Sequence, residues 1–166
     1  MGLLTGENTR DTVVAWVFVA VQAALLLAIL LLPAGDDWSN PAWVATAARW
    51  LELVGFVVLA TGLVNLGTAL TPLPIPVPHG TLRTGGLFRF VRHPIYSGVM
   101  ALAIGAAIRS TNTVILLAAA ALVVLFTAKA RWEERRLAER YADYDDYAAR
   151  TPRFVPFWQV SRPRRG

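Results

Sequence analysis

Two short segments of the chain carry side chains able to bind a charged ligand. The first, Arg92 to Gly98, reads Arg-His-Pro-Ile-Tyr-Ser-Gly and stands at the start of an apolar run. Proline suits the first turn of a helix, so a helix beginning at Pro94 would present free backbone N–H groups to an anion such as a carboxylate or a phosphate. His93 stands at the rim, where its ring can donate a hydrogen bond or take a proton. The alternative is an ordinary turn at a membrane interface, with Arg92 as the anchor.

The second segment is an acidic pair, Glu133 and Glu134, which follows Lys129 by one helical turn. Lys129 and Glu133 share a helix face because they are four residues apart. Such a cluster could bind an amine, a pair of ribose hydroxyls, or Arg92. The alternative is a solvated helix with weak ion pairs such as Glu133 with Arg136, and with Lys129 as a snorkelling anchor.

The composition excludes several other chemistries. No cysteine is present among the 166 residues, so the chain has no thiolate nucleophile, disulfide or Cys-based metal site. The two histidines, His79 and His93, are too few for a metal cage, and we expect no metal. Hydrophobic residues make up 55% and charged residues 16%, against roughly 25% charged in a soluble domain. The length suits one domain, and the apolar excess indicates a membrane protein.

Four apolar runs predict an all-α bundle of about four transmembrane helices. Thr12–Leu32 has 21 residues without a charge, and Leu53–Leu70 has 18, preceded by an amphipathic approach over residues 43–52. Ile95–Ile108 has 14 and Thr113–Ala128 has 16, both short against the roughly 20 residues that cross a bilayer. The turn at residues 109–112 makes these last two runs a helical hairpin.

The charges predict the orientation. The only charged residues of the loop 33–42 are two aspartates, whereas the segment 71–94 holds three arginines and no acid. Ten of the sixteen basic residues lie from Lys129 onward. The positive-inside rule therefore puts both termini and the candidate site in the cytoplasm. This asymmetry accounts for the net charge of +5, so nucleic acid is not an expected partner.

The chain divides into three parts of a single membrane domain, 1–166. Residues 1–70 form two anchoring helices, 71–158 a catalytic core and 159–166 a basic tail. The stretch 151–166 holds four arginines, Arg153 among them, and no acid, which suits anionic headgroups. The core opens with a loop rich in proline and glycine, 71–94, which is long enough to be functional. Residues 129–150 are expected to continue the fourth helix into the cytoplasm.

Several polar and aromatic residues outside these segments receive no chemical role. Tyr141, Tyr144 and Tyr147 would form a stripe on one helix face, suited to the headgroup region. Arg49 and Glu52 suggest a local pair at the interface. Single polar residues within apolar helices can bridge neighbours, and the chain has two such candidates, Gln22 and Asn65.

Taken together, the motifs resemble the isoprenylcysteine carboxyl methyltransferase family, membrane enzymes related to the phospholipid N-methyltransferases. The resemblance lies in the segment Leu82–Gly98, in the acidic pair with the Arg-Arg-Leu that follows it, and in Tyr144–Tyr147 and Arg150–Pro156. It covers residues 80 to 157, and the ordered set of motifs is more specific than Arg-His-Pro alone.

The resemblance implies an integral membrane methyltransferase that uses S-adenosyl-L-methionine and has no soluble Rossmann domain. The implied catalytic residues are His93, Lys129 and Glu133. The implied cofactor contacts, several of them through the backbone, are Gly80, Thr81, Leu82, Arg83, Phe88, His93, Pro94, Ile95, Tyr96, Glu133 and Glu134. The prolines at 72–78 would help to shape a lid over the nucleotide.

The resemblance also bears on the methyl acceptor. The family has an arginine one turn before the glutamate, thought to face a substrate carboxylate, and Lys129 keeps its charge without its bidentate fork. The expected acceptor is a lipophilic small molecule or lipid-modified group, alongside membrane lipids as partners. Alternatives are a phospholipid N-methyltransferase of the phosphatidylethanolamine type, a non-catalytic membrane scaffold, and a membrane reductase that uses NADPH.

Overall fold

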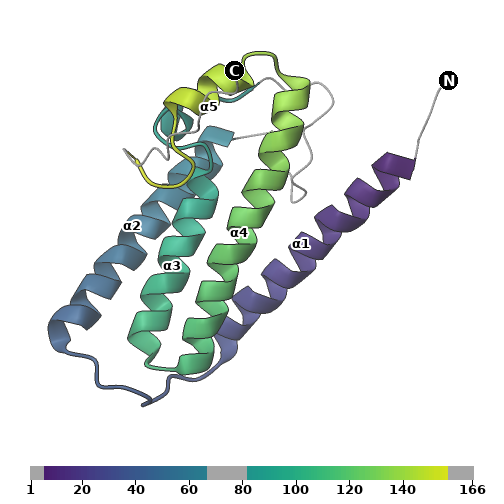
Figure 1. Cartoon of the computed structure of the whole chain (residues 1–166). Coiled ribbons are helices and arrows are strands. Elements are labelled where there is room, and N and C mark those ends of the chain that lie inside the picture. The colour runs from purple at the N-terminus through teal and green to yellow at the C-terminus, as the bar shows by residue number, and fades with distance from the viewer. Residues whose placement is uncertain (1–5, 67–81, 157–166) are drawn as a thin grey trace.

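The computed structural model describes residues 6–66 and 82–156, and within these ranges the only regular elements are helices (Figure 1). The prediction of an all-α protein is therefore confirmed for this part of the chain. Two minor elements, the 3-10 turn η2 and the short helix α5, cover one end of the bundle. The helices are α1 (Gly6–Leu31), α2 (Ala42–Leu66), η2 (Gly86–Arg89), α3 (Pro94–Ser110), α4 (Thr113–Arg140) and α5 (Tyr144–Arg150).

Three of the long helices have the length and hydropathy of membrane spans. They are α1 from Arg10 to Leu31, α2, and α4 with its 28 residues. The apolar run at the start of α4 is short, as predicted. The helix itself is long because it continues beyond that run to Arg140. Helix α3 has 17 residues, so it is apolar but shorter than a span usually is. The predicted amphipathic approach at 43–52 is continuous with the helix that follows it.

Glycines hold α2 and α3 against each other. Gly55 and Gly62 of α2 face α3, while Gly98 and Gly105 of α3 face α2. A Cβ atom on Gly98 would lie 2.6 Å from the Leu59 nitrogen and 2.7 Å from the Gly55 carbonyl oxygen. Small residues let membrane helices approach backbone to backbone. This close contact fixes where α3 begins, and the candidate site is built on that beginning.

The predicted hairpin at residues 109–112 is present. Helix α3 ends at Ser110, and Thr111 turns the chain in the left-handed conformation with φ 49°. The Asn112 side chain then accepts from the Val114 and Ile115 N–H groups at 2.8 and 3.2 Å, an N-cap for α4. Between α3 and α4 the core is apolar, with Ala103, Ala107, Ile115, Leu122 and Phe126 buried.

Helix α1 packs on α4, so the helices follow one another across the bundle as α2, α3, α4 and α1 (Figure 1). Leu25, Leu26 and Ile29 join the apolar core near the far end of α1. Nearer its beginning, Phe18 meets Trp132 edge to face, with ring centroids 6.1 Å apart, and Asp11 pairs with Arg136.

Three predictions, about the extension of the fourth helix, the tyrosines and the pair at the interface, are wrong. Residues 129–150 are not one helix, because α4 stops at Arg140 and α5 starts at Tyr144. The tyrosines therefore form no continuous stripe, and Tyr144 and Tyr147 are buried rather than turned to headgroups. Glu52 pairs with Arg109 of α3 at 3.1 Å, not locally with Arg49, because its helix face meets α3.

Replacing Gly98 by alanine should destabilise the α2–α3 pair, because the added methyl group has no room between two backbones. We expect a loss of about 1–3 kcal/mol, typical of overpacking, seen as a lower thermal unfolding midpoint in detergent. Gly85→Ala is the matched control, since its backbone is extended and a Cβ there meets nothing within 4 Å. Equal midpoints for the two variants would contradict this account of the contact.

Candidate active site

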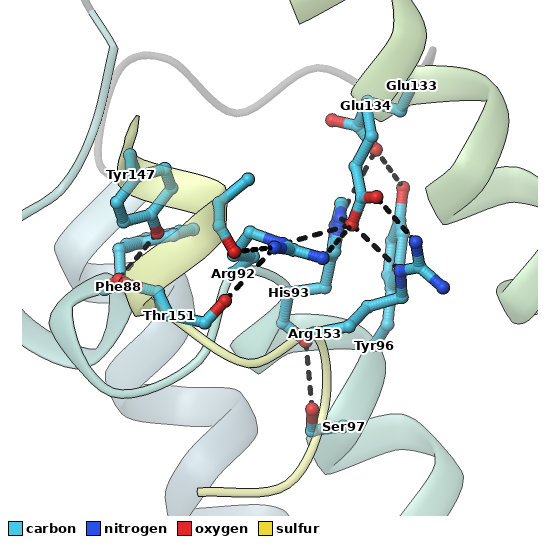
Figure 2. A network of polar contacts seen from close by, with 11 residues as sticks. Phe88, Arg92, His93, Tyr96, Ser97, Glu133, Glu134, Tyr147, Thr151 and Arg153 are labelled. Carbon is cyan, nitrogen blue, oxygen red and sulfur yellow. Dashed lines mark hydrogen bonds and ion pairs between the residues drawn. The ribbon is translucent and has the colours of Figure 1, made fainter. Parts of the chain in front are cut away.

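Three segments that are distant in sequence meet at the start of α3. Pro94 occupies the first helical position, as predicted, and His93 is the N-cap residue. The segment after α5 runs alongside, because the Arg92 N–H donates to the Pro152 carbonyl at 2.9 Å and the His93 N–H to Arg153 at 3.1 Å. The third segment is the turn of α4 that carries the acidic pair (Figure 2).

Glu134 is the centre of this junction. Its side chain is buried, and it accepts from Arg92 Nε at 3.1 Å, from Arg153 Nε and Nη2 at 2.8 and 2.6 Å, and from His93 Nε2 at 3.2 Å (Figure 2). The hydrogen bonds that Arg153 donates to Glu134 raise the pKa of Arg153 above its usual value. Both carboxylate oxygens thus have protein donors. The sequence offered an amine, ribose hydroxyls or Arg92 as partners of the acidic pair, and Glu134 binds Arg92.

Arg92 and Tyr147 extend the junction to α5. Arg92 Nη1 donates to the Ala148 and Thr151 carbonyls at 2.6 and 3.0 Å, and the Tyr147 hydroxyl donates to the Phe88 carbonyl of η2. Burial raises the pKa of Tyr147 to about 12, so the phenol stays a proton donor at neutral pH. Arg92 is therefore a bridge between three segments rather than a headgroup anchor.

Glu133, the other member of the pair, lies differently. Its side chain is 25% exposed, and Oε2 accepts from the Tyr96 hydroxyl at 2.9 Å. His93 stacks on Tyr96 with centroids 5.1 Å apart, and Tyr96 stacks in turn on Phe126 at 4.8 Å. The stack fixes Tyr96, and Tyr96 fixes Glu133, so this carboxylate is oriented and still open to a ligand.

Lys129 lies one turn before Glu133 and is buried, with 4% of its surface exposed. Its Nζ donates to Gln22 Oε1 of α1 at 2.8 Å and lies 5.3 Å from the centroid of the Tyr96 ring. The snorkelling alternative is wrong, because α1 and the aromatic rings cover the side chain. The prediction that Gln22 bridges two helices is confirmed.

The remaining predicted contacts lie on elements that lead into the junction. Leu82 and Arg83 belong to the stretch before η2, and Phe88 is in η2 itself. Ile95 is in the first turn of α3, against Gly62. Gly80 and Thr81 lie outside the described residues, as do the prolines at 72–78.

Sequence reasoning missed two residues of the junction. Arg153 was expected to serve anionic headgroups as part of a basic tail, but it holds Glu134. Tyr144 was assigned to the membrane surface, but it is 2% exposed, and its hydroxyl has no hydrogen-bond partner among the described residues. Burial raises the pKa of Tyr144, and the charge of Glu134 raises it further. The only signal in the sequence was the position of both residues within the C-terminal motifs.

Replacing Glu134 by glutamine should loosen the whole junction, because Arg92 and Arg153 would lose their negative partner. Breaking a buried ion pair from one side costs roughly 3–5 kcal/mol, so the thermal midpoint in detergent should fall by several degrees. Glu139→Gln, at an exposed position of the same helix, is the control and should change little. A midpoint unchanged by Glu134→Gln would mean that the cluster does not stabilise the fold.

Known proteins share this architecture. The chain is similar to the solved structure of the eukaryotic intramembrane Ras methyltransferase ICMT (isoprenylcysteine carboxyl methyltransferase), with a TM-score of 0.62 and 20% identity, over 95% of this chain and 55% of that one. At this identity the likeness concerns the fold, and it supports the predicted integral membrane bundle.

Two relatives are similar in sequence. Protein-S-isoprenylcysteine O-methyltransferase B of Arabidopsis thaliana is 29% identical over 120 residues, 69% of this chain and 60% of that protein. The nickel-cobalt-cadmium resistance protein NccN of Alcaligenes xylosoxydans xylosoxydans is 30% identical over 151 residues, 89% of this chain and 66% of that protein. The chain thus spans about 60% of the length of the first relative. Residues 43–144, more than half of the chain, match the phospholipid methyltransferase family, and the chain belongs to that family.

Proposed function

We propose that the protein is an integral membrane methyltransferase that uses S-adenosyl-L-methionine and acts on a lipophilic acceptor. The observation that carries this proposal is the meeting of His93 and Tyr96, at the start of α3, with Glu133 on α4. Family membership and the name of the Arabidopsis relative support a methyltransferase. The whole chain, 1–166, would act as one membrane domain with its site and both termini in the cytoplasm.

The residues around the junction suit the cofactor. Glu133 offers an oriented, partly exposed carboxylate to an amine or to ribose hydroxyls, and the buried Tyr144 hydroxyl has hydrogen-bonding capacity to spare. The start of α3 and the stretch Gly80–Arg83 would supply further contacts, together with Phe88. Glu134 would act indirectly, by holding Arg92 and His93 in place. When bound, the cofactor supplies an electrophilic methyl group.

Lys129 would orient the acceptor through an anionic group such as a carboxylate. A carboxylate is already a nucleophile, so the protein needs to position it and exclude water rather than remove a proton. An amine would have to be neutral, and His93 or Glu133 could then take its proton. The rings of Tyr96 and Phe126 beside Lys129 suit the lipophilic part of the acceptor.

Phospholipid N-methylation is the second candidate, favoured by the family to which residues 43–144 belong. A phospholipid carries both an anionic phosphate and, in the phosphatidylethanolamine type, an amine to methylate. A non-catalytic scaffold would bind no nucleotide, and a reductase would bind NADPH. Ligand binding therefore separates these classes before any acceptor is known.

The first test is calorimetric titration of the detergent-purified protein with S-adenosylhomocysteine and, separately, with NADPH. We expect binding of the former only. Glu133→Gln should weaken that binding about tenfold or more, since a charge-assisted hydrogen bond contributes roughly 1.5–3 kcal/mol. The thermal midpoint should stay close to that of the wild type because Glu133 is partly exposed.

Glu139→Gln again serves as the control and should bind like the wild type. Wild-type affinity in Glu133→Gln would remove Glu133 from the cofactor site. Binding of NADPH alone would indicate a reductase, and binding of neither compound would favour the scaffold.

A further inference from the structure

Lys129 brings a positive charge into the apolar part of the bundle without a negative partner in direct contact. Its Nζ lies 5.3 and 6.0 Å from the ring centroids of Tyr96 and Phe126. Among the described residues it forms no ion pair, and Glu133, one turn along α4, accepts the Tyr96 hydroxyl. Burial of a cation without an anion in contact is expensive, so an anionic ligand placed against Lys129 would stabilise the ammonium.

Gln22 is the one hydrogen-bond partner of this ammonium among the described residues, at 2.8 Å. An ammonium has three N–H donors, so two remain for a ligand. A neutral amide fixes the direction of the ammonium and adds no negative charge, so the nearest acid is Glu133, one turn away and not in direct contact. A carboxylate at the same position would fix it equally well and would neutralise it.

Helix α1 holds Gln22 toward α4 by contacts on either side of it. Four residues earlier Phe18 meets Trp132, and three to seven residues later Leu25 and Ile29 enter the apolar core. The adjacent Val21 is exposed on the outside of the bundle. Gln22 therefore reaches the site from a helix that lies outside the family match at residues 43–144.

We propose that Gln22 is a positioning residue for the acceptor: it holds the Lys129 ammonium beside Tyr96 without a contacting anion, so that an anionic group of the acceptor can pair with it. This inference rests on the proposed function, in which Lys129 meets an anionic group of the acceptor, and adds to it a residue of α1 that positions Lys129. The anion is either a carboxylate on a lipid-modified group or the phosphate of a phospholipid.

The test measures binding of two detergent-soluble probes by calorimetry, N-acetyl-S-farnesylcysteine for the carboxylate and lysophosphatidylethanolamine for the phosphate. Gln22→Glu should weaken binding of the preferred probe about tenfold or more, because the new carboxylate takes the place of the ligand's charge. Gln22→Leu should weaken it less, about threefold, because the charge remains but its direction is lost. The probe that wild-type protein binds more tightly identifies the source of the anion.

The controls separate positioning from a general effect on the fold. Val21→Leu, at the neighbouring outward position, should bind the probe within about twofold of the wild type, and S-adenosylhomocysteine affinity should stay constant in all Gln22 variants. In a Lys129→Met background, Gln22→Glu should have no further effect on the probe.

Three results would overturn the proposal. The first is wild-type protein that binds neither probe, and the second is wild-type probe affinity in both Gln22 variants. The third is an equal effect of Gln22→Glu with and without Lys129. Failure of the proposed function would look different, since the wild type would then lack affinity for S-adenosylhomocysteine whatever the probes do.

Discussion

The buried carboxylate of Glu134 is the interaction on which the rest of the site depends. It is shared by two guanidinium groups and one imidazole, which come from the start of α3 and from the segment after α5. A charge in this position must be compensated, and each partner brings a different part of the chain with it. Arg92 in turn binds carbonyls at the end of α5. Residues 88–93, which lead into α3, are thus held against α5 and the segment after it.

The adjacent glutamates of α4 differ in role: Glu134 pairs with arginines of the fold, and Glu133 remains partly exposed. Consecutive residues on a helix point about 100° apart, so Glu134 faces the arginines while Glu133 faces Tyr96 and solvent. Lys129 shares the face of Glu133, with the aromatic stack beside it. This part of α4 therefore carries three charged side chains in fixed positions: the buried Lys129, the partly exposed Glu133 and the buried Glu134. Oriented charges of this kind are what a site needs when its task is to position two substrates.

The elements that sequence could predict are those with a local cause. Pro94 starts a helix because proline suits the first turn, and Asn112 starts the next because its side chain caps free N–H groups. Gln22 was expected to bridge helices because an amide in an apolar run needs a partner. The helix start at Pro94, the turn at residues 109–112 and the bridge made by Gln22 are present as predicted, as is the likeness to isoprenylcysteine methyltransferases in fold.

The features that sequence could not predict are set by packing between distant segments. The sequence around Lys129 does not indicate that α1 will cover this side chain. The sequence around Arg153 does not indicate that Arg153 will pair with Glu134 rather than with lipid headgroups. The end of α4 at Arg140 is equally hidden, because residues 141–150 have no proline or glycine to mark a break. Helix α5 lies against the bundle because Tyr144 and Tyr147 are buried there, and this packing is a tertiary effect.

The pairing of residues 152–154 with the start of α3 has a consequence for how the protein is made. The Arg92 and His93 N–H groups donate to the Pro152 and Arg153 carbonyls, and the Ser97 hydroxyl is within hydrogen-bonding distance of the Phe154 carbonyl as well as that of His93. Residues 152–154 leave the ribosome about sixty residues after the start of α3. Chains are synthesised at roughly 5–20 residues per second, so α3 and α4 must wait for seconds before this end of the bundle can close. Closure is therefore a late event in biogenesis, and a nascent chain stalled before Pro152 would leave the Arg92 and His93 N–H groups without their native acceptors.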